Sequence, residues 1–323
     1  MDAVAGRALW MDRLRGLAVV LVIAWHVVSI PTFFGVEMPN LVRWLNDALS
    51  PYRIPTLLVL SGMLLRQSLD KPAVRYYWGK FANIVWPFLV WCVIYLLANP
   101  SVDGSSPAYW LGESYLWYLV VIAFCYAIGP LIRWVHPLLL SVVFIALALL
   151  FSSAPSSVTQ ELVHAPYFFI GVAAIPYVPR LLKMPGWIVL GGGAIALAWA
   201  AYSASHLGYA PRLHPVGTPI SLAGIGCLMW LASKPRRMPA LEWAGRHSLE
   251  LYVAHFPLIV LACTYCPTGL SRPVLYLLFA AVGLGGAAIL ARFFSKTPLF
   301  RLPVPRHARD KRGQLETFGT SDI

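Results

Sequence analysis

The chain has 323 residues, of which 59% are hydrophobic and 12% charged, with a mean hydropathy of +0.69 and a net charge of +12. Water-soluble domains are about 45–50% apolar and about 25% charged, so the composition excludes a water-soluble protein and predicts an all-α polytopic membrane protein. Basic loops that face an anionic inner leaflet account for the positive charge. Aromatic and basic residues are not interleaved as in a nucleic-acid groove, so we expect the lipid bilayer, and no nucleic acid, as a partner.

Ten apolar stretches, each near the roughly 20 residues that cross a bilayer, predict ten transmembrane helices. In chain order these cover residues 14–33, 48–66, 78–98, 115–133, 137–152, 162–178, 186–203, 217–232, 247–265 and 273–294. Pro137, Pro166 and Pro176 weaken the fifth and sixth, although membrane helices tolerate proline where neighbours satisfy the freed backbone groups. No small-residue cleavage site follows the first stretch, so we interpret it as an uncleaved anchor.

The basic residues divide unequally between the two sides of this ten-helix arrangement. An even number of spans places both termini on one side, and that side receives most of the Lys and Arg residues. Because cytoplasmic loops collect Lys and Arg, we expect cytoplasmic termini and a multi-pass location in the inner (cytoplasmic) cell membrane. We expect residues 1–297 to form the membrane domain, and the charged, proline-containing stretch 298–323 to form a disordered cytoplasmic tail.

The first apolar stretch contains two ionisable residues, in the segment RGLAVVLVIAWHVV (15–28). Arg15 and His26 are eleven residues apart, or about three helical turns, so they share one face at a separation of about 16 Å. Arg15 at the cytoplasmic boundary is typical of the positive-inside pattern. His26 would be costly on a lipid-facing surface, so we expect it to face an interior cavity. Spacing alone leaves a structural hydrogen bond and a functional role equally open.

Other polar residues interrupt the second and fourth apolar stretches. YRIPTLLVLSG (52–62) carries Arg53 near the outer end and Ser61 deeper in the membrane. Arg53 could be a snorkelling side chain or a functional one. Trp117 lies near the outer interface, where aromatic belts are common.

The ninth stretch carries a polar stripe within GRHSLELYVAHFP (245–257). Ser248 and His255 are seven residues apart, close to two helical turns, and Tyr252 lies near the same line. Such a stripe favours a bundle interior over lipid, but spacing does not decide between substrate binding and helix packing. Further along, Cys263 and Cys266 could be apolar wall residues or a disulfide or redox pair.

Four motifs, in order along the chain, together resemble the acyltransferase-3 family of integral membrane acyltransferases. They are RGLAVVLVIAWH, YRIPTLLVLSG, LWYLVVIAFCYAIGP and GRHSLELYVAHFPL, and the resemblance covers roughly residues 10–295. It implies transfer of an acyl group, usually acetyl, from cytosolic acyl-CoA to a hydroxyl of an extracytoplasmic envelope saccharide or glycolipid. It assigns the catalytic base to His26 and a contact with the CoA phosphates to Arg15.

The resemblance also suggests roles for further residues. Where the family often has R-x-x-R at the start of the third helix, this chain has Lys80 and Asn83, so we expect Lys80 together with Arg75 or Arg66 to complete the phosphate site. Acceptor or oxyanion binding is expected from Arg53, Ser61, Trp117, Ser248, Tyr252 and His255. No metal is predicted. Direct transfer and an acyl-histidine relay both remain open, and we expect transfer to finish within the membrane domain.

Two other classes of function remain as alternatives. An intramembrane histidine beside a polar stripe would also suit a multi-pass transporter or flippase of a glycan-related small molecule. No inverted repeat is visible, which disfavours that class. The third class is a non-catalytic assembly partner in which His26 is structural.

Overall fold

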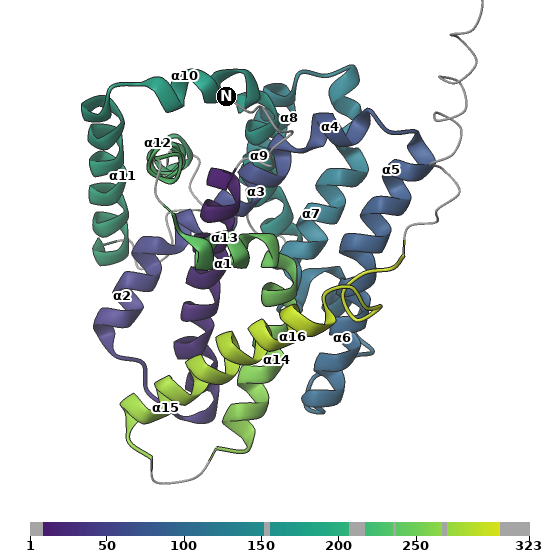
Figure 1. Cartoon of the computed structure of the whole chain (residues 1–323), viewed down its shortest axis with the longest axis vertical. Helices are drawn as coiled ribbons and strands as arrows, with labels where there is room; N and C mark the ends of the chain where they lie inside the picture. The colour runs from purple at the N-terminus through teal and green to yellow at the C-terminus, as the bar shows by residue number, and fades with distance from the viewer. Residues whose placement is uncertain (1–8, 152–155, 207–216, 235–236, 267–269, 304–323) are drawn as a thin grey trace, which may run out of the picture.

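The computed structural model describes residues 9–151, 156–206, 217–234, 237–266 and 270–303, and within these ranges the chain forms helices and no strands. The α-helices in chain order are α1 (Leu9–Ser29), α2 (Asn40–Leu49), α3 (Ile54–Met63), α4 (Leu65–Leu69), α5 (Ala73–Lys80), α6 (Trp86–Ala98), α7 (Trp117–Ile128), α8 (Pro137–Leu150), α9 (Ser156–Ala174), α10 (Val178–Lys183), α11 (Gly186–His206), α12 (Gly217–Ala232), α13 (Pro239–Arg246), α14 (Ser248–Thr264), α15 (Arg272–Ala280) and α16 (Ala287–Phe294). Helix α1 packs against α3, α12, α13 and α14 near the centre of the molecule (Figure 1).

Within the described residues, five helical stretches are long and apolar enough to cross a membrane: Leu9–Phe34, Ala73–Ala98, Val158–Lys183, Gly186–His206 and Arg272–Phe294. Helices α13 and α14 would add a sixth, bent by 83° at the break between them. Each of the ten predicted stretches contains helix, several of them shorter than a full crossing. The all-α membrane class is therefore confirmed, whereas the number of crossings and the side of the termini stay predictions.

Several helix boundaries differ from the sequence prediction. Helix α2 was not predicted, because it is a short helix with polar and apolar faces and a search for long apolar runs passes over it. It packs against α11, where the Trp44 indole donates a hydrogen bond of 2.8 Å to the Ser205 hydroxyl. A short turn at Ser50–Tyr52 separates α2 from α3. Pro51 lies at the start of this turn and Pro55 at the start of α3, and proline is tolerated in the first turn of a helix but not in its interior.

Helices α1 and α13 approach so closely that their backbones touch. A Cβ atom at Gly16 would collide with the carbonyl oxygen of Leu241, and one at Gly245 would collide with the carbonyl oxygen of Asp12. Small residues at helix interfaces allow this kind of approach in membrane proteins. The pair of glycines sets the position of the first helix against the hinge before α14.

Arg13 ties the same end of α1 to its neighbours. Its Nε donates to Glu242 Oε1 at 2.8 Å, and its Nη1 donates to the carbonyl oxygens of Ala232 and Lys234 at 3.1 and 3.0 Å. A charged group that is 9% exposed needs such partners. The guanidinium of Arg13 is thus part of the packing, which separates its role from that of Arg15.

The last described segment packs against the third predicted stretch. Trp86 and Trp91 donate indole hydrogen bonds to the carbonyl oxygens of Pro298 and Leu299 at 2.6 and 3.0 Å, and Phe300 is buried against Trp91. The packed part of the chain thus continues past residue 297 to Phe300. The predicted tail beyond residue 303 lies outside the described residues.

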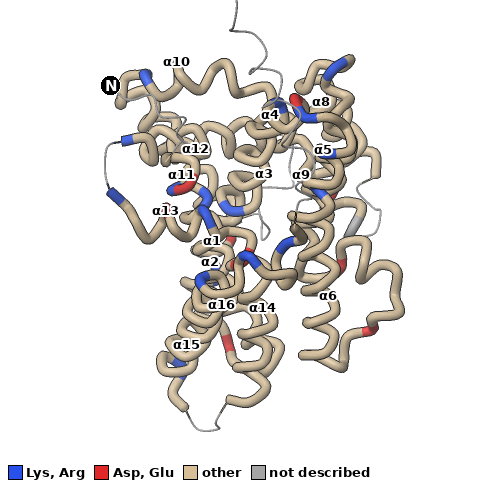
Figure 2. The backbone as a smooth tube through the Cα atoms, turned by 45° about the vertical axis from the view of Figure 1, so that its right-hand side comes forward, with Lys and Arg blue, Asp and Glu red and all other residues tan. Residues whose placement is uncertain are grey.

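In Figure 2, Lys and Arg positions occur near α10, α4 and α5 in the upper part of the view, near α1, α13 and α16 at its centre, and near α15 below. Near the start of α15, Arg272 pairs with Glu37 at 2.8 Å. Asp103 and Glu113 lie in the connection after α6. The predicted orientation therefore rests on the order of the Lys and Arg residues in the sequence.

Candidate active site

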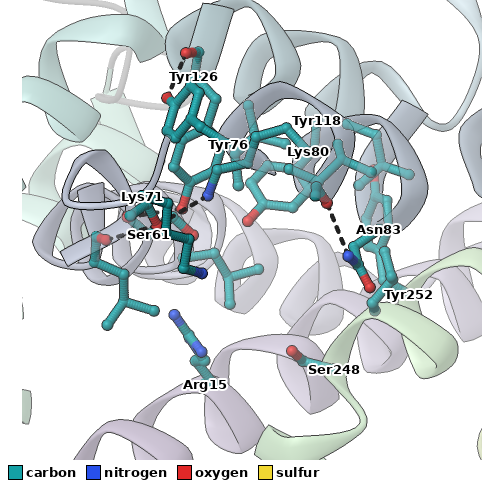
Figure 3. A pocket seen from close by; sticks show the side chains of 18 of the residues that line it. Arg15, Ser61, Lys71, Tyr76, Lys80, Asn83, Tyr118, Tyr126, Ser248 and Tyr252 are labelled. Carbon is teal, nitrogen blue, oxygen red and sulfur yellow. Dashed lines mark hydrogen bonds between the residues drawn. The ribbon is translucent and has the colours of Figure 1, made fainter. Parts of the chain in front are cut away.

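A cavity of about 350 Å³ lies between α1, α3, α5, α7 and α14 (Figure 3). Four cationic residues line it: Arg15, Lys71, Arg75 and Lys80. None of the described residues that line this cavity is an Asp or Glu. Four positive charges around a partly enclosed space raise the local concentration of anions, so the cavity is suited to an anionic ligand such as a phosphate ester.

The four cations lie at different depths. Lys71 and Arg75 are exposed, whereas Arg15 and Lys80 are half-buried. The Arg15 guanidinium points into the cavity from α1, with Ser248 beside it (Figure 3). The Lys80 ammonium donates to Ser68 Oγ at 3.2 Å and lies 3.4 Å from the centre of the Tyr126 ring. Two cations are thus positioned inside the cavity, while the other two lie at its mouth.

The helix that carries Lys80 widens just after it. Residues Phe81–Val85 form a turn of π-helix (η3) between α5 and α6. Pro87 has no N–H to donate to the carbonyl of Asn83, which removes one α-helical hydrogen bond at this position. Wide turns of this kind occur often at functional sites. Here the turn carries Asn83, whose side chain also lines the cavity.

Tyrosine hydroxyls hold the upper wall of the cavity in Figure 3 together. The Tyr76 hydroxyl donates to the carbonyl of Tyr126 at 2.6 Å, and the Tyr126 hydroxyl donates to the carbonyl of Ser61 at 3.0 Å. The Tyr118 and Ser61 side chains also interact by a hydrogen bond. The wall therefore presents polar groups inside an otherwise apolar bundle.

The polar stripe of α14 runs from the cavity towards the histidines. Ser248 and Tyr252 line the cavity, and the Tyr252 hydroxyl donates to the carbonyl of Tyr115 at 2.9 Å. In return the Tyr115 hydroxyl donates to the carbonyl of Val253 at 2.7 Å. That carbonyl lacks its usual helical donor because residue 257 is proline. The two tyrosines therefore fix α14 against the start of α7.

His26 and His255 form a pair at the end of this stripe. The Nδ1 atom of His26 lies 3.0 Å from Nε2 of His255, and Nδ1 of His255 lies 3.0 Å from the carbonyl oxygen of Leu251. His255 is fully buried, whereas His26 is half-buried. The ring of Phe256 packs edge-on to the His26 ring at 5.2 Å. A histidine on α1 thus meets a histidine 229 residues later in the chain.

The cavity stops short of this pair. Tyr252 lines the cavity, and its ring centre lies 5.9 Å from that of His255. On α14 the two residues are separated by about 4.5 Å along the helix axis. Tyr252 is therefore the residue that connects the cationic cavity to the histidine pair.

The structure brings most of the predicted site residues together. Lining the cavity are Arg15, Ser61, Arg75, Lys80, Ser248 and Tyr252, while His26 and His255 adjoin it through Tyr252. Arg66, the alternative to Arg75, is exposed on α4 and does not belong to the lining. The geometry thus favours Arg75 as the cation that accompanies Lys80.

Two predicted residues lie elsewhere. Arg53 is 6% exposed, donates to the carbonyl of Asn46 at 3.2 Å and lies 5.7 Å from the Trp25 ring. Trp117 packs against the His164 ring at 4.7 Å. Their role in substrate binding remains a prediction, and any contact that they make with a substrate would lie outside the cationic cavity.

Sequence reasoning missed several cavity residues, namely Ser68, Lys71, Tyr76, Asn83 as a cavity group, Tyr118 and Tyr126. Ser68, Lys71 and Tyr76 fell in the predicted loop between residues 66 and 78, whereas the structure places Ser68 on α4, Lys71 between α4 and α5, and Tyr76 on α5, which begins at Ala73. Tyr118 and Tyr126 are eight residues apart on one apolar helix, and that periodicity could have identified them. Within the described parts of the chain, no group of three His, Cys, Asp or Glu residues could hold a metal ion.

A family model described as an acyltransferase domain, that of the acyltransferase-3 family, matches residues 8–292. The match covers α1 through most of α16, and so includes every residue of the cavity and the histidine pair. A search of curated proteins and a search of solved structures each returned no match.

Proposed function

Because this chain belongs to the acyltransferase-3 family and is a membrane acyltransferase, we propose that it transfers an acetyl group from cytosolic acetyl-CoA to a hydroxyl of an extracytoplasmic envelope saccharide. His26 is the general base in this proposal. The protein crosses the inner membrane ten times, with both termini in the cytoplasm.

The cationic cavity is the single observation that carries the proposal. CoA is a polyanion with a diphosphate and a further phosphate, and Arg15, Lys71, Arg75 and Lys80 supply positive charge in one enclosed place. Guanidinium groups match phosphate oxygens with two parallel hydrogen bonds, and an ammonium acts as a point charge. The exposed position of Lys71 and Arg75 fits a ligand that enters with its nucleotide at the mouth.

Reaction geometry follows from the distance between the two ends of the site. Arg15 and His26 are about 16 Å apart along α1, so an extended pantetheine arm would carry the thioester from the cations towards the histidine. Tyr252 and Tyr118, whose rings meet edge to face at 5.3 Å, have to move for the thioester to reach His26. His26 then takes the proton from the acceptor hydroxyl as its oxygen attacks the thioester carbonyl. Direct attack and an acyl-histidine relay are both compatible with this arrangement.

The acceptor approaches His26 from the face opposite the donor. Trp25 precedes His26 on α1, and Arg53 lies 5.7 Å from the Trp25 ring. A guanidinium and an indole are suited to hydroxyl and carboxyl groups of a saccharide. We expect Arg53 to contact the acceptor, with Trp117 further along its path.

The test uses membranes that contain the full-length protein and the native envelope acceptor. Acetyl-CoA with a labelled acetyl group is supplied to the cytoplasmic face, and label in the envelope glycan is measured. The His26→Ala variant is expected to lose transfer by about 10²–10⁴-fold, because general-base catalysis contributes about that much. His206→Ala, which removes an exposed histidine at the end of α11, is the matched control and is expected to retain activity.

Wild-type transfer by correctly folded His26→Ala would contradict the catalytic assignment. Movement of a glycan precursor across the membrane without acetyl-CoA would instead indicate the transporter function. Family membership favours the transferase.

A further inference from the structure

We infer that His255 is a positioning residue that sets the tautomer and the orientation of His26. The inference rests on the proposed function of His26 as the base, and it replaces the expected role of His255 in binding the acceptor. Because His255 is fully buried and both of its ring nitrogens already have partners, a substrate could reach it only by displacing one of them. One of those partners is His26 itself.

The hydrogen-bond partners decide which nitrogens carry protons. A backbone carbonyl can only accept, so the contact of 3.0 Å between His255 Nδ1 and the Leu251 carbonyl requires a proton on Nδ1. In a neutral imidazole the other nitrogen, Nε2 of His255, is then an acceptor. The contact of 3.0 Å between that atom and His26 Nδ1 therefore requires a proton on His26 Nδ1. Nε2 of His26 is left with its lone pair available, as a general base needs.

The other proton arrangements are less favourable. If His255 donated through Nε2 and lacked the Nδ1 proton, its Nδ1 lone pair would face the Leu251 carbonyl lone pairs at 3.0 Å. If His255 carried both protons, a positive charge would be buried in a fully enclosed site in which the two hydrogen-bond partners are neutral.

His255 can hold His26 firmly because its own position is over-determined. Just before His255, the Tyr252 hydroxyl donates to the Tyr115 carbonyl and the Tyr115 hydroxyl donates to the Val253 carbonyl, which joins α14 to the residues that precede α7. Phe256, the next residue, packs against Tyr115 at 4.6 Å and edge-on to the His26 ring. A base that is oriented by a third group, itself held by the scaffold, is the arrangement that nucleophile activation generally requires.

The reaction balances around this tautomer. Nε2 of His26 accepts the proton of the acceptor hydroxyl while the new C–O ester bond forms. The C–S bond of the thioester then breaks, and the proton on Nε2 is returned to the leaving thiolate to give free CoA. His255 accepts the Nδ1–H hydrogen bond throughout, and stabilises the imidazolium that exists between the two proton transfers.

Two variants of similar size separate this role from simple packing. His255→Gln keeps an acceptor, because the side-chain amide oxygen can lie near the former Nε2 position, whereas His255→Leu has none. With labelled acetyl-CoA and membranes containing the native acceptor, we expect His255→Leu to lower kcat by about 100-fold, a part of the usual general-base contribution, and His255→Gln to stay within about tenfold of wild type. The KM for acetyl-CoA should not change in either variant, since the cationic residues are untouched.

His206→Leu is the control. The His206 Nδ1 makes the same contact one turn back, with the Tyr202 carbonyl at 3.1 Å, but His206 lies outside the cavity and the histidine pair. Its variant should keep the wild-type kcat. Equal losses in the Leu and Gln variants of His255, wild-type kcat in both, or a change in KM alone would overturn the positioning role. An inactive His26→Ala with an active His255→Leu overturns this inference alone, whereas an active His26→Ala overturns the proposed function.

A measurement on the unmodified protein decides the matter if His255→Leu does not fold. Solid-state NMR of ¹⁵N-histidine-labelled protein in lipid vesicles distinguishes protonated from unprotonated ring nitrogens, and a His26→Gln sample identifies the His26 signals. Protonated Nδ1 with unprotonated Nε2 on His26 is expected. The reverse tautomer would overturn the inference.

Discussion

Arg13 and Arg15 are two residues apart on α1 and have different roles. Arg13 is enclosed by an ion pair and two carbonyls that join α1 to its neighbours. Among the residues that the structure describes, Arg15 reaches only the Leu60 carbonyl at 3.5 Å, at the limit of hydrogen-bond distance, and it points into the cavity. An arginine whose donors are largely unused by the protein is available for a ligand.

Lys80 is the cavity cation whose loss should be easiest to measure. We expect Lys80→Met to raise the KM for acetyl-CoA by about tenfold with little change in kcat, because a charge-assisted hydrogen bond contributes about 1.5–3 kcal/mol. The measurement is initial rate against acetyl-CoA concentration in membranes. The effect should shrink as salt is added, since ions screen the attraction.

Arg66→Met is the control for Lys80→Met, because Arg66 is an exposed cation on α4 that does not line the cavity. It should leave the KM unchanged. An equal rise in KM for both variants would mean that the charge of the surface as a whole, and not the cavity, binds the donor.

Close helix packing positions the site at the level of elements. Helix α1 carries Arg15 and His26, and α14 carries Ser248, Tyr252 and His255, so their relative position decides whether the site exists. The crossing of α1 and α13 at Gly16 and Gly245 sets that position, since α14 follows α13 after a bend of 83°. The cationic cavity and the hydrogen bond between His26 and His255 thus depend on Gly16 and Gly245, although these glycines touch neither the cavity nor the histidines.

Gly16→Ala should therefore destabilise the protein and reduce its activity. The added methyl would meet the Leu241 backbone carbonyl, which cannot move aside as a flexible side chain would, and overpacking of this kind costs about 1–3 kcal/mol. Thermal unfolding in detergent should show a lower Tm than wild type. Gly191→Ala is the control, because no atom lies within 4 Å of a Cβ built there. It should leave the Tm unchanged or raise it, since alanine favours helix. Equal Tm values for Gly16→Ala and wild type would show that the crossing can relax.

At the scale of the whole molecule, the Lys and Arg pattern of the sequence predicts how the protein is oriented in the membrane. In the sequence, most of the Lys and Arg residues fall on the same side of the predicted helices as Lys71 and Arg75, which line the cavity. If the positive-inside rule holds, the mouth opens to the cytoplasm, where acyl-CoA is found. The predicted orientation of the protein in the membrane therefore also predicts the side from which acyl-CoA enters the cavity.

Cysteine labelling in intact cells tests this orientation. A membrane-impermeant maleimide should label Asp103→Cys, in the exposed connection after α6, and should not label Gln67→Cys, on the exposed side of α4, until the cells are opened. The unmodified protein, with its own five cysteines, gives the background. The opposite pattern would place the cavity mouth outside the cell and would contradict a cytosolic donor.

The sequence by itself was sufficient for properties that depend on composition and local periodicity. Apolar content predicted the helical membrane class, and the eleven-residue spacing predicted that Arg15 and His26 share a face of α1. Likewise, the spacing on α14 predicted the stripe from Ser248 to His255. Helical geometry alone determines which residues of one helix share a face, so no knowledge of the neighbouring helices was needed.

Contacts between helices required the tertiary structure. The sequence did not indicate that His26 would meet His255, that Lys71 would join Arg15 in the cavity, or that Arg53 and Trp117 would lie apart from it. Those contacts depend on how far each helix slides and turns against its neighbours, which close packing at positions such as Gly16 and Gly245 determines. Because one residue of register moves a side chain about 100° around a helix, no local pattern on α1 or α14 could predict which residues of the two helices would meet.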